Sequence, residues 1–190
     1  MIGNTEVEYK YWTDMTVQEF QERIRHAMKV NHRPMPKHLY AVSVDDYYLD
    51  ADKSFIRHRK SNTGAELTVK KKLSENVVRT EVNINVDANS DLDVSQFTTL
   101  LGYERSFQVY KEAWIWDVDD LHEAGNKVDI SYYTLADGRN VIELEAHIEH
   151  QSVEAAIAAI DWWEHELDLS TEKKEPRSLY EIFTEELNIN

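Results

Sequence analysis

The sequence predicts an α+β fold in which an antiparallel β-barrel with a charged interior is covered by α-helices. Several short segments alternate charged with apolar residues, which is the period of a strand with two different faces. Other segments place apolar residues at helical spacing. Of the 190 residues, 42% are hydrophobic, while only 5 Gly and 3 Pro give no sign of a long linker. We therefore expect one domain over residues 1–190.

The clearest alternation is at the beginning of the chain, where residues 6–10 read Glu-Val-Glu-Tyr-Lys. In a strand, Glu6, Glu8 and Lys10 share one face, and the apolar and aromatic side chains take the other. Two acids beside one base on a strand face are unfavourable unless other charges compensate them. A divalent metal ion together with a polyanion would do so.

Four further segments repeat this alternation, with either acidic or basic residues gathered on one face. They are residues 56–59, 66–72, 79–84 and 142–148. An amphipathic strand at a solvated surface explains any one of them, but five strands sorted into acidic and basic types favour a shared polar interior. A closed antiparallel barrel provides that interior and removes its own strand edges. Closure would also bring residues 6–10 close to residues 143–148.

The periodicity also places the individual elements. Strands are predicted at residues 6–10, 39–44, 47–49, 54–60, 66–72, 77–85, 107–116, 127–133 and 141–148. Helices are predicted at residues 16–30, 95–102, 152–167 and 179–187, where they can cover the apolar outer faces of the strands. Thr16 followed by Glu19 predicts a capping box at the start of the first helix.

The charge balance limits the chemical class of the ligand. The net charge of −15, from 36 acidic and 21 basic residues, disfavours non-specific nucleic-acid binding. Against this background, one short central stretch concentrates basic residues. They are Arg57, Arg59, Lys70, Lys72 and Arg79. A concentrated positive site on an acidic chain predicts a small, highly charged anion as the ligand.

The same composition bears on the compartment. With 0 Cys, the chain has neither a disulfide scaffold nor thiolate chemistry. No apolar signal core precedes residues 6–10, and no run approaches the roughly 20 apolar residues of a membrane span. We expect a cytoplasmic protein that does not bind membranes, and the sequence leaves open whether it forms a homodimer.

Several motifs together carry a resemblance to a known family. In chain order they are Glu6-x-Glu8-x-Lys10, residues 46–50, Arg57-x-Arg59, residues 67–70, Arg79-x-Glu81, residues 101–103 with Lys111, Glu143-x-Glu145 and residues 178–182. This series resembles the CYTH proteins, also called triphosphate tunnel metalloenzymes, over nearly the whole chain. The resemblance implies a closed eight-stranded antiparallel barrel, a tunnel with a charged lumen.

The residues predict metal-assisted phosphoryl chemistry. Carboxylates are hard oxygen ligands that suit Mg²⁺ or Mn²⁺, and the candidate metal ligands are Glu6, Glu8, Glu81, Glu143 and Glu145. Basic side chains bind phosphate oxygens, and the candidates are Lys10, Arg57, Arg59, Lys70, Lys72, Arg79 and Lys111. Among these, Glu6, Lys10 and Arg57 are the predicted catalytic residues, with Lys10 positioning the attacking water or taking its proton.

We therefore predict an enzyme that hydrolyses the terminal phosphate of a small-molecule triphosphate. The resemblance implies inorganic tripolyphosphate, thiamine triphosphate or nucleoside triphosphates as substrate types. One alternative from the same family is a class IV adenylate cyclase, which makes cyclic AMP from ATP. Another is a nucleotide or polyphosphate binder without turnover.

Two positions depart from the family pattern. Two residues after Lys111, where the family usually has a basic residue, this chain has Ala113. About ten residues before Glu143, where the family usually has an aspartate, it has Tyr133, although Asp129 shares the same strand parity. One phosphate contact and one metal ligand are therefore expected to differ, which motivates the binder alternative.

Overall fold

A computed structural model describes residues 4–51, 55–72, 78–87, 91–119, 127–148 and 152–189; at residues 4, 5, 70–72, 78–80, 119, 127, 147 and 148 it describes the backbone alone. The strands in these ranges are β1 (Asn4–Thr13), β2 (His38–Leu49), β3 (Phe55–Ser61), β4 (Gly64–Lys72), β5 (Val78–Val86), β6 (Glu104–Asp119), β7 (Lys127–Leu135), β8 (Asn140–Ile148) and β9 (Lys173–Glu175). The helices are α1 (Val17–Val30), α2 (Asp91–Leu100), α3 (Val153–Glu166) and α4 (Leu179–Glu186).

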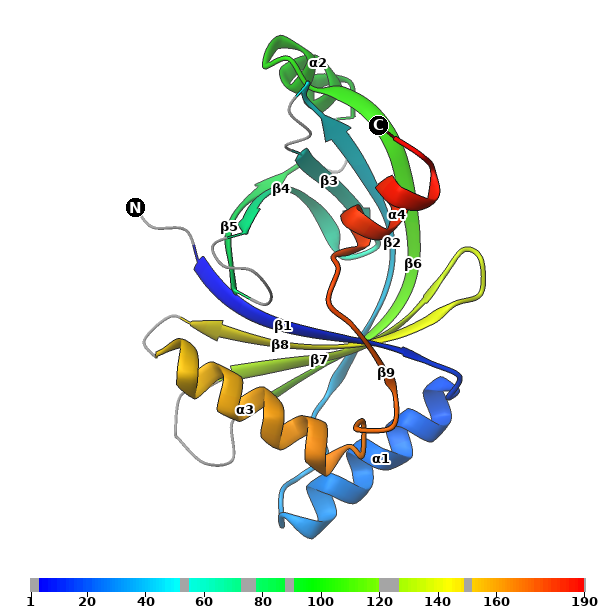
Figure 1. Cartoon of the computed structure of the whole chain (residues 1–190), viewed down its shortest axis with the longest axis vertical. Helices are drawn as coiled ribbons and strands as arrows, with labels where there is room; N and C mark the ends of the chain where they lie inside the picture. Colours follow the sequence, from blue (N-terminus) through cyan, green and yellow to red (C-terminus); the bar gives the residue numbers. More distant parts are fainter. Residues whose placement is uncertain are drawn as a thin grey trace.

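All the strands pair antiparallel in one sheet, in the order β5-β4-β3-β2-β6-β7-β8-β1-β9. The sheet curls round on itself, so that β1 also pairs with β5 from Asn4↔Glu81 to Val7↔Val78 (Figure 1). Further along β1, residues 10–12 pair with β9 instead. The predicted eight-stranded antiparallel barrel is confirmed as a tunnel-like curled sheet, in which β5 and β1 meet over four residue pairs.

Two parts of the sheet differ from the sequence-based expectation. Residues 39–44 and 47–49 were expected as two strands, but they belong to the continuous strand β2. Asp45 and Asp46 do not break this strand because both carboxylates are buried and have basic partners, one on each face of the sheet. The short strand β9 was not predicted at all, since three residues carry too little pattern to indicate a strand.

Helices α1 and α3 cover the outer face of β1, β6, β7 and β8 (Figure 1). The capping box predicted for α1 is present, with the Glu19 amide donating to Thr16 Oγ1 at 3.3 Å and the Thr16 amide donating to Glu19 Oε2 at 2.7 Å. Phe20 of α1 packs edge-on against Trp116 of β6, with ring centroids 5.8 Å apart. Apolar burial of this kind fixes the outer faces of the strands and so directs their charged faces into the tunnel.

Helix α4 packs differently, because it lies inside the curve that β2 and β6 form (Figure 1). Its Leu179 and Ile182 are buried against Tyr47, Phe107 and other side chains on the inner face of the sheet. One end of the tunnel is therefore filled by apolar side chains of the chain itself.

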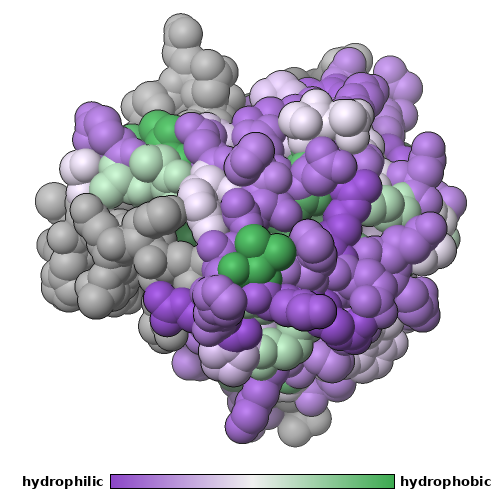
Figure 2. Space-filling model, turned by 90° about the horizontal axis from the view of Figure 1, so that it is seen from below, coloured by the Kyte–Doolittle hydropathy of each residue, from purple (hydrophilic) through white to green (hydrophobic). Residues whose placement is uncertain are grey.

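One face of the molecule carries mainly polar side chains (Figure 2). The face seen from below Figure 1 is largely hydrophilic, with small separate hydrophobic patches (Figure 2). In the part of the chain that the structure describes, no helix is both long and apolar enough to span a membrane.

Candidate functional site

The inner face of the curled sheet encloses a cavity of about 290 Å³. The predicted site residues that line it come from β3, β5, β6 and β8, which are far apart in the sequence. They are Arg57, Arg59, Glu81, Lys111, Glu143 and Glu145. Because side chains alternate along each strand, these six charged side chains face the tunnel together.

A smaller cavity of about 50 Å³ adjoins the end filled by α4. Four side chains line both cavities, namely Arg57, Arg59, Lys111 and Glu143. The smaller cavity adds Glu8 and Lys10 of β1, so the two cavities share one cationic wall.

The other predicted site residues are placed as follows. Glu6 is buried in β1, opposite Arg79 of β5 and His147 of β8 in register, and is not among the described residues that line either cavity. Lys70 and Lys72 lie in β4 and Arg79 lies in β5. The side chains of these three basic residues lie outside the described part of the chain.

Three carboxylates converge at the junction of β1 and β8. Oxygen atoms of Glu8, Glu143 and Glu145 all lie within 4.8 Å of one another. The register brings them together, because Glu8 is opposite Glu145 and Lys10 is opposite Glu143. Lys10 makes ion pairs with Glu8 and, at 3.2 Å, with Glu143 Oε2. A compact set of carboxylate oxygens fits a hard divalent ion such as Mg²⁺ or Mn²⁺.

Tyr133 contacts this acidic set. Its hydroxyl donates a hydrogen bond to Glu143 Oε2 at 3.3 Å. Burial raises the pKa of Tyr133 well above its ordinary value, and the nearby charge of Glu143 raises it further. Tyr133 is therefore a neutral donor at neutral pH. At the position where an aspartate was expected, the chain carries a group that orients a carboxylate.

On the opposite wall, Arg57 of β3 is buried, with 9% of the residue exposed. Its Nη2 donates to Thr68 Oγ1 at 2.9 Å and lies 3.5 Å from Glu66 Oε1. Its buried Nε has no hydrogen-bond partner among the described residues. A buried N–H without an acceptor is costly, and the side chain of Arg57 lines both cavities.

Asp45 is the site residue that the sequence reasoning missed. It is fully buried on the inner face of β2, where Oδ1 accepts from Arg59 Nε at 2.8 Å and Oδ2 accepts from Arg59 Nη2 at 3.0 Å. Lys111 Nζ also lies 2.8 Å from Asp45 Oδ2. Burial alone would raise the pKa of Asp45, but the charges of Arg59 and Lys111 reverse that effect and hold it below its ordinary value.

The neighbouring residue Asp46, which opens the family-like motif at residues 46–50, faces outward. Its Oδ1 accepts from Arg105 Nε at 2.9 Å and from Gln108 Nε2 at 2.6 Å. Alternation from the inward-facing Ser43 would have assigned Asp45 to the tunnel, had residues 39–49 been taken as one strand.

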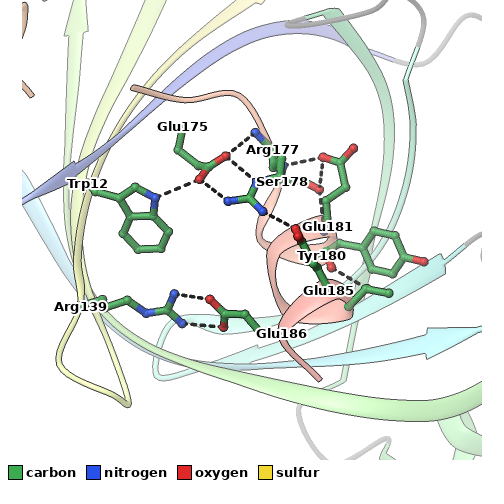
Figure 3. Close-up of polar contacts among 10 residues, drawn as sticks. Trp12, Arg139, Glu175, Arg177, Ser178, Tyr180, Glu181, Glu185 and Glu186 are labelled. Carbon is green, nitrogen blue, oxygen red and sulfur yellow. Dashed lines mark hydrogen bonds and ion pairs between the residues drawn. The ribbon is translucent and has the colours of Figure 1, made fainter. Parts of the chain in front are cut away.

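A polar network holds α4 over the closed end of the tunnel (Figure 3). Glu175 of β9 accepts from Trp12 Nε1 at 3.0 Å and from Arg177 Nε at 2.8 Å, and Arg177 also pairs with Glu185 of α4. Arg139 pairs with Glu186 at 2.7 Å. These contacts tie α4 to β1, β9 and the β7–β8 turn, so the tunnel is blocked at this end.

No family model and no curated protein matches the chain. Solved structures do match. A conserved hypothetical protein from Pyrococcus furiosus is 21% identical with a TM-score of 0.70, covering 93% of this chain and 98% of that one. A putative adenylate cyclase from Vibrio parahaemolyticus is 15% identical with a TM-score of 0.68, covering 96% of this chain and 99% of that one. The Mimivirus capping enzyme triphosphatase is 11% identical with a TM-score of 0.52, covering 87% of this chain and 90% of that one.

The chain has the triphosphate tunnel fold. At these identities the likeness concerns the fold. Within it, the basic wall of Arg57, Arg59 and Lys111 and the acidic set on β1 and β8 face the same tunnel. Ala113 also lies in the tunnel wall, opposite Tyr133 in register. Both departures from the family pattern thus fall inside the tunnel rather than on the outer surface.

Proposed function

We propose that this chain is a metal-dependent triphosphatase that releases the terminal phosphate of a small-molecule triphosphate in the cytoplasm. One observation carries the proposal: a buried cationic wall and a cluster of three carboxylates share one tunnel that is blocked at one end. Polyphosphate chemistry needs this combination, since phosphoryl transfer depends mainly on positioning and on charge stabilisation. The names of two tunnel-fold neighbours, a triphosphatase and a putative adenylate cyclase, support it.

In this proposal, Arg57, Arg59 and Lys111 bind phosphate oxygens. The side chain of Arg57 lines both cavities, and the side chain of Arg59 is 32% exposed within the tunnel wall. Arginine can engage two oxygens of one phosphate, whereas Lys111 acts as a point charge. Lys70, Lys72 and Arg79 are further proposed donors.

Glu8, Glu143 and Glu145 would hold the divalent ion, and Glu6 and Glu81 are additional proposed ligands. When bound, Mg²⁺ or Mn²⁺ supplies positive charge at the phosphate oxygens and acidifies water. Tyr133 orients Glu143 through its hydrogen bond. Lys10 contacts two carboxylates, an environment that suits an ammonium ion. We therefore assign Lys10 to positioning the attacking water and not to removing its proton.

The reaction is the attack of water oxygen on the terminal phosphorus. A new P–O bond forms, and the bond from that phosphorus to the bridging oxygen breaks. The departing diphosphate keeps the electron pair, and the water proton passes to the phosphate products. The cations on β3 and β6 stabilise the negative charge that develops on the oxygens.

The first test is phosphate release from tripolyphosphate, thiamine triphosphate and ATP, each with Mg²⁺ and with Mn²⁺. We expect release that depends on the metal and that falls by about 100-fold or more in Glu8→Gln, because a ligand of the ion is lost. Glu22→Gln is the matched control, since Glu22 lies on α1 with 69% of its side chain exposed. Tight, metal-dependent binding of all three compounds without phosphate release would refute the triphosphatase and leave the binder.

A second candidate is the class IV adenylate cyclase, which the name of the Vibrio parahaemolyticus neighbour favours. It would use the same cations and carboxylates on the α-phosphate of ATP. Chromatography of the ATP products separates the two candidates. Cyclic AMP with pyrophosphate identifies the cyclase, and ADP with phosphate identifies the triphosphatase.

The pH dependence offers an independent check. The pKa of Lys111 is lowered to about 8, because burial and the charge of Arg59 lower it by more than Asp45 raises it. Since kcat/KM follows the protonation of the free enzyme, we expect kcat/KM to fall as the pH rises through about 8 and Lys111 loses its charge. Lys111→Arg stays charged and should lose this descending limb, and a limb that persists in the variant would assign it to another group.

The same shift has the opposite effect on stability. The folded state holds Lys111 with a lowered pKa, so between about 8 and the ordinary lysine pKa the unfolded state binds more protons. The contribution of Lys111 to the free energy of unfolding should therefore increase as the pH rises through that window, while kcat/KM declines.

A further inference from the structure

The larger cavity has two chemically different parts. Beside its charged residues, four apolar side chains form a continuous strip on the adjacent strands β2 and β6. They are Leu39, Ala41, Ala113 and Ile115, and we call them the apolar wall. Leu39 is opposite Ile115 and Ala41 is opposite Ala113 in the strand register. The two apolar pairs therefore lie next to each other on one strand pair.

The apolar wall lies on the open side of the site. Along the inner face of β2, the order is Leu39, Ala41, Ser43 and then Asp45, and exposure falls from 50% at Leu39 to 8% at Ala41. Along β6, Ile115 and Ala113 precede Lys111 in the same direction. The wall therefore leads from the mouth of the tunnel to the buried cations, and α4 blocks the far end.

The change from apolar residues at the mouth to cations further inside orients any ligand whose phosphates reach the cations. A strand rises about 3.4 Å per residue, so the four steps from Lys111 to Ile115 span roughly 14 Å. Phosphates bound at Arg57, Arg59 and Lys111 thus leave the opposite end of the ligand beside Ala113 and Ile115. Inorganic tripolyphosphate is charged along its whole length and gains nothing from apolar contact there.

We propose that the substrate is an organic triphosphate whose ring-bearing group packs against Leu39, Ala41, Ala113 and Ile115, in preference to inorganic tripolyphosphate. This inference rests on the proposed function, because it assumes that the cations hold the phosphates. The polar side chains of Ser61, Thr63 and Asn83 line the same cavity and can meet polar atoms at the edge of such a ring. Small side chains at Ala41 and Ala113 leave room for a flat group over the wall.

The test compares kcat/KM for ATP, thiamine triphosphate and tripolyphosphate in the wild type and in Leu39→Ser/Ile115→Ser. In the wild type we expect at least one organic triphosphate to exceed tripolyphosphate by about tenfold or more, since loss of an apolar contact is worth about that much in specificity. In the double variant, the ratio of the preferred organic triphosphate to tripolyphosphate should fall by about tenfold. Ile84→Ser, on the outer face of β5 with 59% exposure, should leave the ratio unchanged.

A wild type that prefers tripolyphosphate overturns the inference, and so does a double variant that loses activity on all substrates in equal proportion. If the double variant does not fold, as judged by circular dichroism, Ile115→Thr replaces it in the same comparison. If no compound is hydrolysed, the proposed function fails. The inference is then decided by calorimetric dissociation constants: organic triphosphates must bind more tightly than tripolyphosphate, and only while Leu39 and Ile115 are intact.

Discussion

Replacing Arg57 with alanine is expected to lower kcat/KM for the hydrolysed triphosphate by about 100- to 1,000-fold, the usual effect of losing one preorganised charged donor. Arg57 lines both tunnel cavities, so its guanidinium can meet a ligand bound there. Its Nη2 is fixed by Thr68, so the guanidinium is oriented before any ligand arrives. The measurement is steady-state phosphate release with each metal ion.

Two further variants separate charge from geometry. Arg57→Lys keeps the positive charge but loses the planar set of donors, so it should recover only part of the activity. Arg25→Ala is the matched control, because Arg25 lies on α1 with 51% of its side chain exposed. Near-normal turnover in Arg57→Ala, with an unchanged melting temperature, would exclude Arg57 from phosphate binding.

The strands and their inner faces could be predicted because period-two alternation is a local property of the sequence. Glu8, Lys10 and Glu143 were assigned to one interior from alternation alone, and the register of β1 and β8 places them side by side. The pattern of helix α1 was equally local, since Thr16 and Glu19 cap it through contacts three residues apart. Apolar burial then selects which face of each strand points inward.

The remaining features depend on contacts between distant segments. Asp45 and Asp46 are adjacent and identical in the sequence, and their partners on the two sides of β2 show which of them faces the tunnel. Similarly, the apolar pattern of α4 predicts a helix, but not that its apolar face fills the tunnel end. The hydrogen bond from Tyr133 to Glu143 spans adjacent strands, so the sequence showed Tyr133 in place of the expected aspartate but not that its hydroxyl donates to Glu143.

The Asp45→Asn substitution is expected to lower the free energy of unfolding by about 3–5 kcal/mol, the usual cost of removing one partner from a buried ion pair. Arg59 and Lys111 would lose the carboxylate that accepts from both of them. Because the pKa of Asp45 is lowered by folding, its contribution is complete above its unfolded pKa and disappears as the pH falls through the folded value. Urea unfolding near neutral pH measures the full effect.

Asp46→Asn is the matched control, because Asp46 is adjacent, buried and also paired, but with cations on the outer face. Arg105 is 50% exposed and Lys60 is 28% exposed, so water can solvate them and the loss should be about 1 kcal/mol. Equal losses in the two variants would contradict a special role for the tunnel pair.

Tripolyphosphate should distinguish the two variants as well, if the proposed phosphate site is correct. An anion that binds Arg59 and Lys111 replaces the charge that Asp45→Asn removes. The ligand should therefore bind Asp45→Asn more tightly than the wild type and raise its melting temperature further, in line with linkage between binding and folding. For Asp46→Asn the ligand-induced shift should equal that of the wild type, because its carboxylate contacts no cation of the tunnel. A smaller shift in Asp45→Asn than in the wild type would mean that Asp45 organises the cations for phosphate rather than competing with it.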